Sequence, residues 1–131
     1  MAALATMRAA ARVFTILGVS TVTASCVTFG PEDAFASVLV HNECTSPIFT
    51  GIGLTRDEAL ESLGRRDGAV GPGDYLGRSV HVYESHMESS LVLAISSPSG
   101  AVTYWQTTVE AAVDRERRVK VLADCETIAN G

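Results

Sequence analysis

The sequence predicts a mainly β protein: a small antiparallel β-sandwich with one short helix, stapled by one disulfide. Three observations predict this fold. Short β-rich segments alternate with turns that contain Gly and Pro, without the strand–helix–strand rhythm of a parallel sheet. The segment Leu91-Val92-Leu93-Ala94-Ile95 is apolar on both faces, which is typical of a fully buried strand. Two cysteines, Cys44 and Cys125, lie near opposite ends of the predicted domain and are suited to join its first and last strands.

The first half of the domain contains two predicted strands. Residues 38–42 are short and β-branched, and turn-forming residues follow them up to Pro47. Residues 48–54 form the second strand, in which Ile48, Ile52 and Leu54 share one face. Glycines at 51 and 53 leave the opposite face of this strand nearly bare.

One short helix follows the second strand. Thr55 and Glu58 have the spacing of a capping box, in which each side chain bonds the backbone of the other residue. Ala59, Leu60 and Leu63 then supply a short apolar stripe. We expect a helix of two turns that ends at Gly64 in a left-handed conformation.

The second half of the domain continues as strands. Residues 65–73 are predicted as a loop, residues 75–84 as a strand and residues 85–90 as a polar connection. After the buried strand 91–95, Ser97-Pro98-Ser99-Gly100 predicts a hairpin turn into a strand at 101–109. Residues 110–118 suit either a helical turn or a loop. The closing strand, 119–123, leads to Cys125.

The first 25 residues have the pattern of an export signal. Arg8 and Arg12 precede an apolar run of about ten residues that ends in small residues. That run is too short to span a bilayer, which takes about 20 apolar residues. We therefore expect a signal peptide at 1–25, a tether at 26–37 and a single domain at 38–131, located outside the cytoplasm.

The end of this signal, Val22-Thr23-Ala24-Ser25-Cys26, resembles the lipobox of bacterial lipoproteins. In that family the cysteine becomes the lipid-modified first residue of the mature protein, so the resemblance implies lipidation of Cys26 and a membrane anchor. Thr23 departs from the preferred Leu, Val or Ile. Cleavage after Ala24 or after Ala36 stays open as an alternative and would release a secreted form instead.

The cysteine count agrees with export. If Cys26 belongs to the signal, Cys44 and Cys125 remain as a pair, and such pairs are usually oxidised to a disulfide in exported proteins. A bond between them closes a loop of about 80 residues, worth roughly 4 kcal/mol in the chain-entropy description. The alternative is two free buried thiols.

The charge balance argues against two classes of partner. The chain has 10 basic and 15 acidic residues, and without Arg8 and Arg12 the net charge of the exported part is −7. Nucleic acids and anionic membrane surfaces favour a cationic partner, so we expect neither as a ligand. The basic cluster Arg115–Lys120 is interrupted by Glu116 and is interpreted as a solvated turn that enters a strand.

The one group with metal-ligand chemistry is His81, His86 and Met87. These side chains suit copper or zinc, although His81 and His86 have opposite parity along an extended strand. A metal-handling protein is therefore the alternative hypothesis. Otherwise no cofactor is expected.

Catalysis has weaker support in the sequence. It has no Gly-x-Ser-x-Gly motif and no spacing that favours His41, His81 or His86 as a base, so no catalytic residue is assigned and a hydrolase is the third hypothesis. Trp105 can lie inward in the core or outward as an anchor for a protein or sugar partner. We favour the inward position, since a small domain needs its largest apolar side chain buried.

The sequence thus predicts a non-catalytic binding or structural module of the bacterial cell envelope. Its expected partners are the membrane, through the lipid, and an envelope protein or glycan. The segment 38–44, Pro72-Gly73-Asp74 and the late cysteine also resemble small uncharacterised exported domains of bacteria with GC-rich genomes. That resemblance implies no particular activity.

Overall fold

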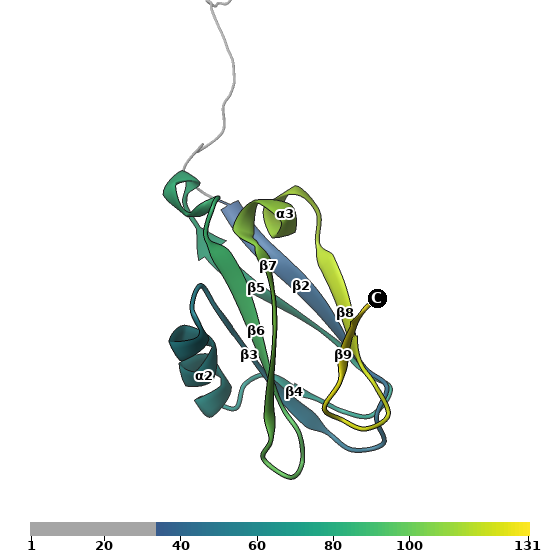
Figure 1. The fold of residues 1–131 in the computed structure, drawn as a ribbon. Helices are drawn as coiled ribbons and strands as arrows, with labels where there is room; N and C mark the ends of the chain where they lie inside the picture. The colour runs from purple at the N-terminus through teal and green to yellow at the C-terminus, as the bar shows by residue number, and fades with distance from the viewer. Residues whose placement is uncertain (1–33) are drawn as a thin grey trace, which may run out of the picture. The chain divides into compact units, whose positions relative to one another are not determined.

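The computed structural model describes residues 34–131, and its strands form two four-stranded sheets (Figure 1). The first sheet has the order β5 (Tyr75–Val82), β2 (Ala34–Asn42), β8 (Arg117–Val121) and β9 (Ile128–Asn130). The second sheet has the order β4 (Ala69–Val70), β3 (Ile48–Gly53), β6 (Ser90–Ser96) and β7 (Val102–Thr108). The predicted mainly β fold with two sheets and a disulfide is confirmed.

The main core lies between the two sheets. Alternate residues of β2 point into it: Ala36, Val38 and Val40 are fully buried, and their neighbours along the strand are more exposed. The α-helix α3 (Val109–Asp114) adds Val109 and Ala112 at one end of this core. The other buried apolar residues of the cluster come from both sheets and the Cys44 turn: Cys44, Ile48, Ile52, Val70, Val82, Leu91, Leu93, Ile95, Val119 and Val121.

The outer face of the second sheet is covered by the α-helix α2 (Arg56–Gly64), as Figure 1 shows. Ala59 of the helix packs against Val92 and Ala94 of β6. The helix comes so close to β3 that a Cβ atom on Gly51 would collide with the backbone of Ala59 and Leu63. This packing explains why β6 is apolar on both faces, since one face meets the core and the other meets α2.

The capping box at the start of α2 is confirmed in part. The Thr55 hydroxyl accepts a hydrogen bond from the Glu58 N–H at 3.1 Å, as predicted. The Glu58 carboxylate accepts instead from the N–H of Leu54 at 2.8 Å. The expected left-handed end at Gly64 is wrong: the positive φ of 61° lies at Arg66, two residues later, because the chain continues one more helical step through Arg65.

One pairing differs from the antiparallel pattern that the sequence predicts. β2 and β8 are parallel neighbours, with Val40 opposite Val119, whereas the other strand pairs are antiparallel. The 74 residues between these strands include the whole second sheet, which provides the long crossover that a parallel pair needs.

The start of the domain also differs from the prediction. Residues 34–37, which the sequence placed in the tether, are the first part of β2 and pair with β5 from Val82 to Ser79. They belong to the strand because their alternation continues that of 38–42, with Ala36 buried in the core. Residues 34–131 form one compact unit.

No helix within residues 34–131 is both long and apolar enough to span a membrane.

Candidate functional site

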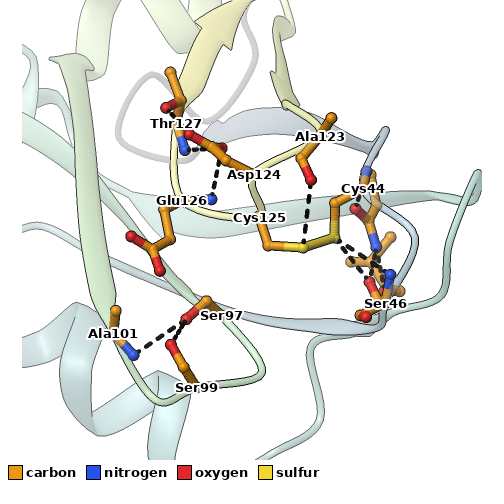
Figure 2. Close-up of a disulfide and its surroundings, with 12 residues drawn as sticks. Cys44, Ser46, Ser97, Ser99, Ala101, Ala123, Asp124, Cys125, Glu126 and Thr127 are labelled. Atoms are coloured by element: carbon orange, nitrogen blue, oxygen red, sulfur yellow. Dashed lines mark hydrogen bonds between the residues drawn. A yellow bond between two sulfur atoms is a disulfide. The ribbon is translucent and has the colours of Figure 1, made fainter.

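The disulfide between Cys44 and Cys125 joins the two turns that follow β2 and β8 (Figure 2). Because these strands are parallel neighbours, β2 and β8 finish at the same end of the sheet. The Cα atoms of Cys44 and Cys125 are 5.2 Å apart. The sulfur of Cys44 is buried, which makes the bond part of the core boundary.

Asn42 organises the turn that carries Cys44. Its side chain is fully buried and donates hydrogen bonds to the carbonyl oxygens of Ser46 at 2.8 Å and Val70 at 3.0 Å. Its amide oxygen accepts from the N–H of Cys44 at 2.9 Å. One side chain thereby fixes the turn and links β2 of the first sheet to β4 of the second.

Asp124 organises the opposite turn. Its carboxylate accepts hydrogen bonds from the hydroxyl and N–H of Thr127 and from the N–H of Glu126. These bonds, with the Thr127 hydroxyl as the largest contribution, hold the pKa of Asp124 below its ordinary value because they favour the charged form. The turn also holds the backbone of Cys125 at φ 63°, a left-handed conformation that residues other than glycine rarely adopt.

The three residues of the metal hypothesis lie near one end of β5, but they have different surroundings. Met87 packs against the main core, and the Nδ1 atom of His86 accepts a hydrogen bond from the N–H of Tyr83 at 3.1 Å. His81 lies on the outer face of the first sheet, with its ring 5.0 Å from that of Tyr83. Residues 34–131 contain no group of three His, Cys, Asp or Glu side chains that is placed to hold a metal.

The outer face of the first sheet gathers aromatic rings and imidazoles. Phe35 lies 5.2 Å from His81, and His41 stacks on Tyr75 at 4.1 Å with the two rings nearly parallel. Phe35 and Tyr75 are each 62% exposed. The imidazole of His41 also lies 3.5 Å from the carboxylate of Glu43. His41 and His86 therefore contact rings, a carboxylate and backbone, and neither hydrogen bonds to a serine hydroxyl within the described residues.

A pocket lies where β7 of the second sheet meets β8 and β9 of the first. We call it the arginine pocket; it has a volume of about 540 Å³ and is lined by Trp105, residues 115–118 and Asn130. β9 pairs with Val119, Lys120 and Val121, and the N–H of Gly131 donates a hydrogen bond to the carbonyl oxygen of Arg118. The segment before Arg118 therefore has no strand beside it on that side. Arg115, Arg117 and Arg118 are all exposed there.

Trp105 forms one wall of the arginine pocket. It is partly buried against the main core, and its indole N–H donates to the side-chain oxygen of Asn130 at 3.2 Å. The neighbouring Tyr104 faces the other way, toward α2, where Arg56 lies 4.5 Å from the centre of its ring. The inward position favoured for Trp105 is thus close to the observed one, at the rim of the core rather than at its centre.

A second pocket, which we call the histidine pocket, adjoins the arginine pocket at Arg118. It has a volume of about 260 Å³ and is lined by Leu39, His41, Glu43, Tyr75 and Lys120 together with Arg118. Lys120 lies 4.0 Å from the carboxylate of Glu43. The linings of the two pockets share Arg118 and Gly131.

Sequence reasoning missed the arginine pocket, because the cluster Arg115–Lys120 was interpreted as a solvated turn. A signal was present: these six residues hold four of the eight basic side chains of residues 34–131, which carry 13 acidic ones. Their position beside Trp105 depends on packing between the sheets and has no local sequence signature. Cys26 lies outside the described residues, so its lipidation stays a prediction.

Comparison with protein-family models, with curated proteins and with solved structures finds no match to this chain.

Proposed function

We propose that this protein is a non-catalytic binding module of the bacterial cell envelope, exported by its N-terminal signal and anchored through a lipid on Cys26. The disulfide between Cys44 and Cys125 is the observation that carries the proposal. Such bonds persist outside the cytoplasm and are rare where thiol reductants are abundant. This chemistry agrees with the charge and hydropathy pattern of residues 1–25.

The start of β2 supports processing at Cys26 rather than at Ala36. Ala36 has no exposed surface, and cleavage after it would remove three residues that pair with β5. Processing before Cys26 leaves the strand whole. Eight residues, 26–33, would then separate the lipid from the domain, with a reach on the order of 25 Å when extended.

The aromatic surroundings of the histidines support binding. The rings of His41 and His86 lie beside those of Tyr75 and Tyr83. Exposed rings next to charged groups offer contact area with little loss of side-chain freedom on binding. The outer face of the first sheet, along β2 and β5, therefore suits recognition of a ligand.

The anchor is tested by expressing the full chain in a bacterium and replacing Cys26 with alanine. The unsubstituted protein should be found in the membrane fraction, with a mass that fits a diacylated N-terminal cysteine. Cys26→Ala should lose both the added mass and the membrane association, whereas Ser25→Ala, a matched change beside it, should keep both. A native protein that starts at Met1 and stays in the cytosol would contradict the proposal.

A further inference from the structure

We propose that the arginine pocket is a binding site for an acidic glycan, whose sugar rings carry carboxylate or phosphate groups. This inference deepens the proposed binding function and depends on it for its setting in the cell envelope. Its chemistry, however, depends only on residues 34–131.

The charge of the pocket opposes the charge of the domain. Residues 34–131 carry 8 basic and 13 acidic side chains, yet the pocket wall from Arg115 to Arg118 has three arginines and one glutamate. A concave site with such a local excess of positive charge attracts anions even on an acidic protein. Lys120 extends this positive strip into the histidine pocket.

The pocket arginines differ from Arg66 and Arg78 in their partners. Arg78 bonds Ser62 and pairs with Asp67, and Arg66 lies over the ring of Phe49. Within residues 34–131 the guanidinium groups of Arg115, Arg117 and Arg118 have no ion pair or hydrogen bond of this kind. Their donors are therefore available to a ligand, and a guanidinium group matches the two oxygens of a carboxylate or phosphate.

Trp105 and the adjoining pocket indicate that the anion is carried on rings. An indole offers a flat apolar surface, and Asn130 fixes its orientation through the 3.2 Å hydrogen bond. The histidine pocket has its own flat pair, His41 stacked on Tyr75, and shares Arg118 with the first pocket. Two pockets of about 540 and 260 Å³ that meet at one arginine suit successive units of a chain of acidic sugars.

The experiment uses the fluorescence of Trp105, the only tryptophan of the chain, in a protein of residues 27–131, which contains the whole compact unit. The probe is an oligogalacturonate of four units, with one carboxylate on each ring. Its fully methyl-esterified form is the uncharged match. The acidic form should shift the emission in a saturable way, and raising the salt concentration should weaken binding. The ester should not bind.

Two matched variants locate the site. Arg117→Gln with Arg118→Gln should weaken binding about tenfold or more, because two charge-assisted contacts are lost. Arg65→Gln with Arg66→Gln removes the same charge from another adjacent arginine pair, at the end of α2, and should leave the affinity within about twofold. The pair Arg117→Lys with Arg118→Lys should keep part of the affinity, since the charge remains without the planar fork. Circular dichroism melting checks that each variant is folded.

Four results would overturn the inference. The first is that the oligogalacturonate does not saturate the protein at millimolar concentration, and the second is that both double glutamine variants lose the same affinity for it. The third is that inorganic phosphate saturates the site while the oligogalacturonate does not bind. The fourth is that an oligothymidylate binds as tightly as the oligogalacturonate. The protein tested lacks Cys26, so none of these results bears on the lipid anchor. Conversely, an unmodified Cys26 would leave the binding experiment intact.

Discussion

The two sheets of this domain are supported in different ways. The second sheet carries α2 on its outer face, with the helix backbone resting against Gly51 and Ala59 packed on Val92 and Ala94. No described element covers the outer face of the first sheet, where Phe35 and Tyr75 are exposed. That sheet is instead joined covalently where β2 and β8 end. One sheet is held by packing on both faces, whereas the other leaves a surface open for contacts and has a covalent link.

Removing the disulfide between Cys44 and Cys125 should change the stability of the domain the most. Replacing both Cys44 and Cys125 with alanine should lower the free energy of unfolding by about 4 kcal/mol, because the unfolded chain loses a closed loop of some 80 residues. Urea denaturation measures this value. Amide exchange should accelerate first in β2 and β8 and later in β3 and β6. Uniform acceleration in both sheets would contradict the distinction between them.

Two glycine substitutions compare the covered outer face of the second sheet with the open outer face of the first sheet. Gly51→Val should destabilise the domain by about 3 kcal/mol, since its side chain has to displace α2. Gly77→Val, on the open face, should change stability by only about 0.5 kcal/mol, because a Cβ atom there meets no other group within 4 Å. Urea midpoints for the two proteins make the comparison. Equal losses would mean that the helix does not constrain the second sheet.

Asn42 connects the two sheets, and its loss should have an intermediate effect. Asn42→Ala leaves the buried Cys44 N–H and the carbonyl oxygens of Ser46 and Val70 without their partner. We expect a loss of about 2 kcal/mol by urea denaturation. Ser79→Ala, an exposed change on β5, is the control and should be nearly neutral. An unaffected Asn42→Ala protein would show that water replaces the side chain.

The smallest effect concerns the Cys125 turn and pH. The pKa of Asp124 is lowered in the folded protein, so its charged form contributes stability above its unfolded pKa, and that contribution is lost as the pH falls through the folded pKa. Carboxyl NMR titration should give a midpoint below that of an ordinary aspartate. Thr127→Val removes the hydroxyl that contributes most to lowering the pKa of Asp124, so it should raise the titration midpoint of that carboxyl group. A midpoint that does not move would assign the shift to the backbone N–H groups alone.

Much of the second sheet could be predicted from the sequence, because its signals are local. Five consecutive apolar residues at 91–95 indicate a strand that is buried on both faces. Gly51 and Gly53 mark the face of β3 against which α2 packs. The Thr55 cap fixes the start of α2. Each of these features depends on neighbours only a few positions away in the chain.

The first sheet was harder to predict, because its pairing depends on distant segments. Strand periodicity indicates which face is buried but not which strand lies beside it, so the parallel pairing of β2 with β8 was missed. The cysteines held a clue: each follows the end of its strand by a few residues, and a bond between neighbouring strands at that position requires parallel strands. β9 of this sheet, with three residues, is too short to show a period.

The arginine pocket could not be predicted for a related reason. The basic cluster is visible in the sequence, but Trp105 belongs to the other sheet and reaches Asn130 only because the two sheets pack together. The metal hypothesis had the opposite difficulty. His81, His86 and Met87 are close in sequence, yet Met87 turns toward the core while His81 stays on the outer face.

Thiol labelling in living cells tests most directly whether this domain works outside the cytoplasm. Cells that express the chain are treated with a permeant alkylating reagent before lysis, and Cys44 and Cys125 are then examined by peptide mass spectrometry. The account predicts that neither cysteine is labelled until a reductant is added. Complete labelling of both cysteines without reductant, in a protein that retains Met1, would contradict it.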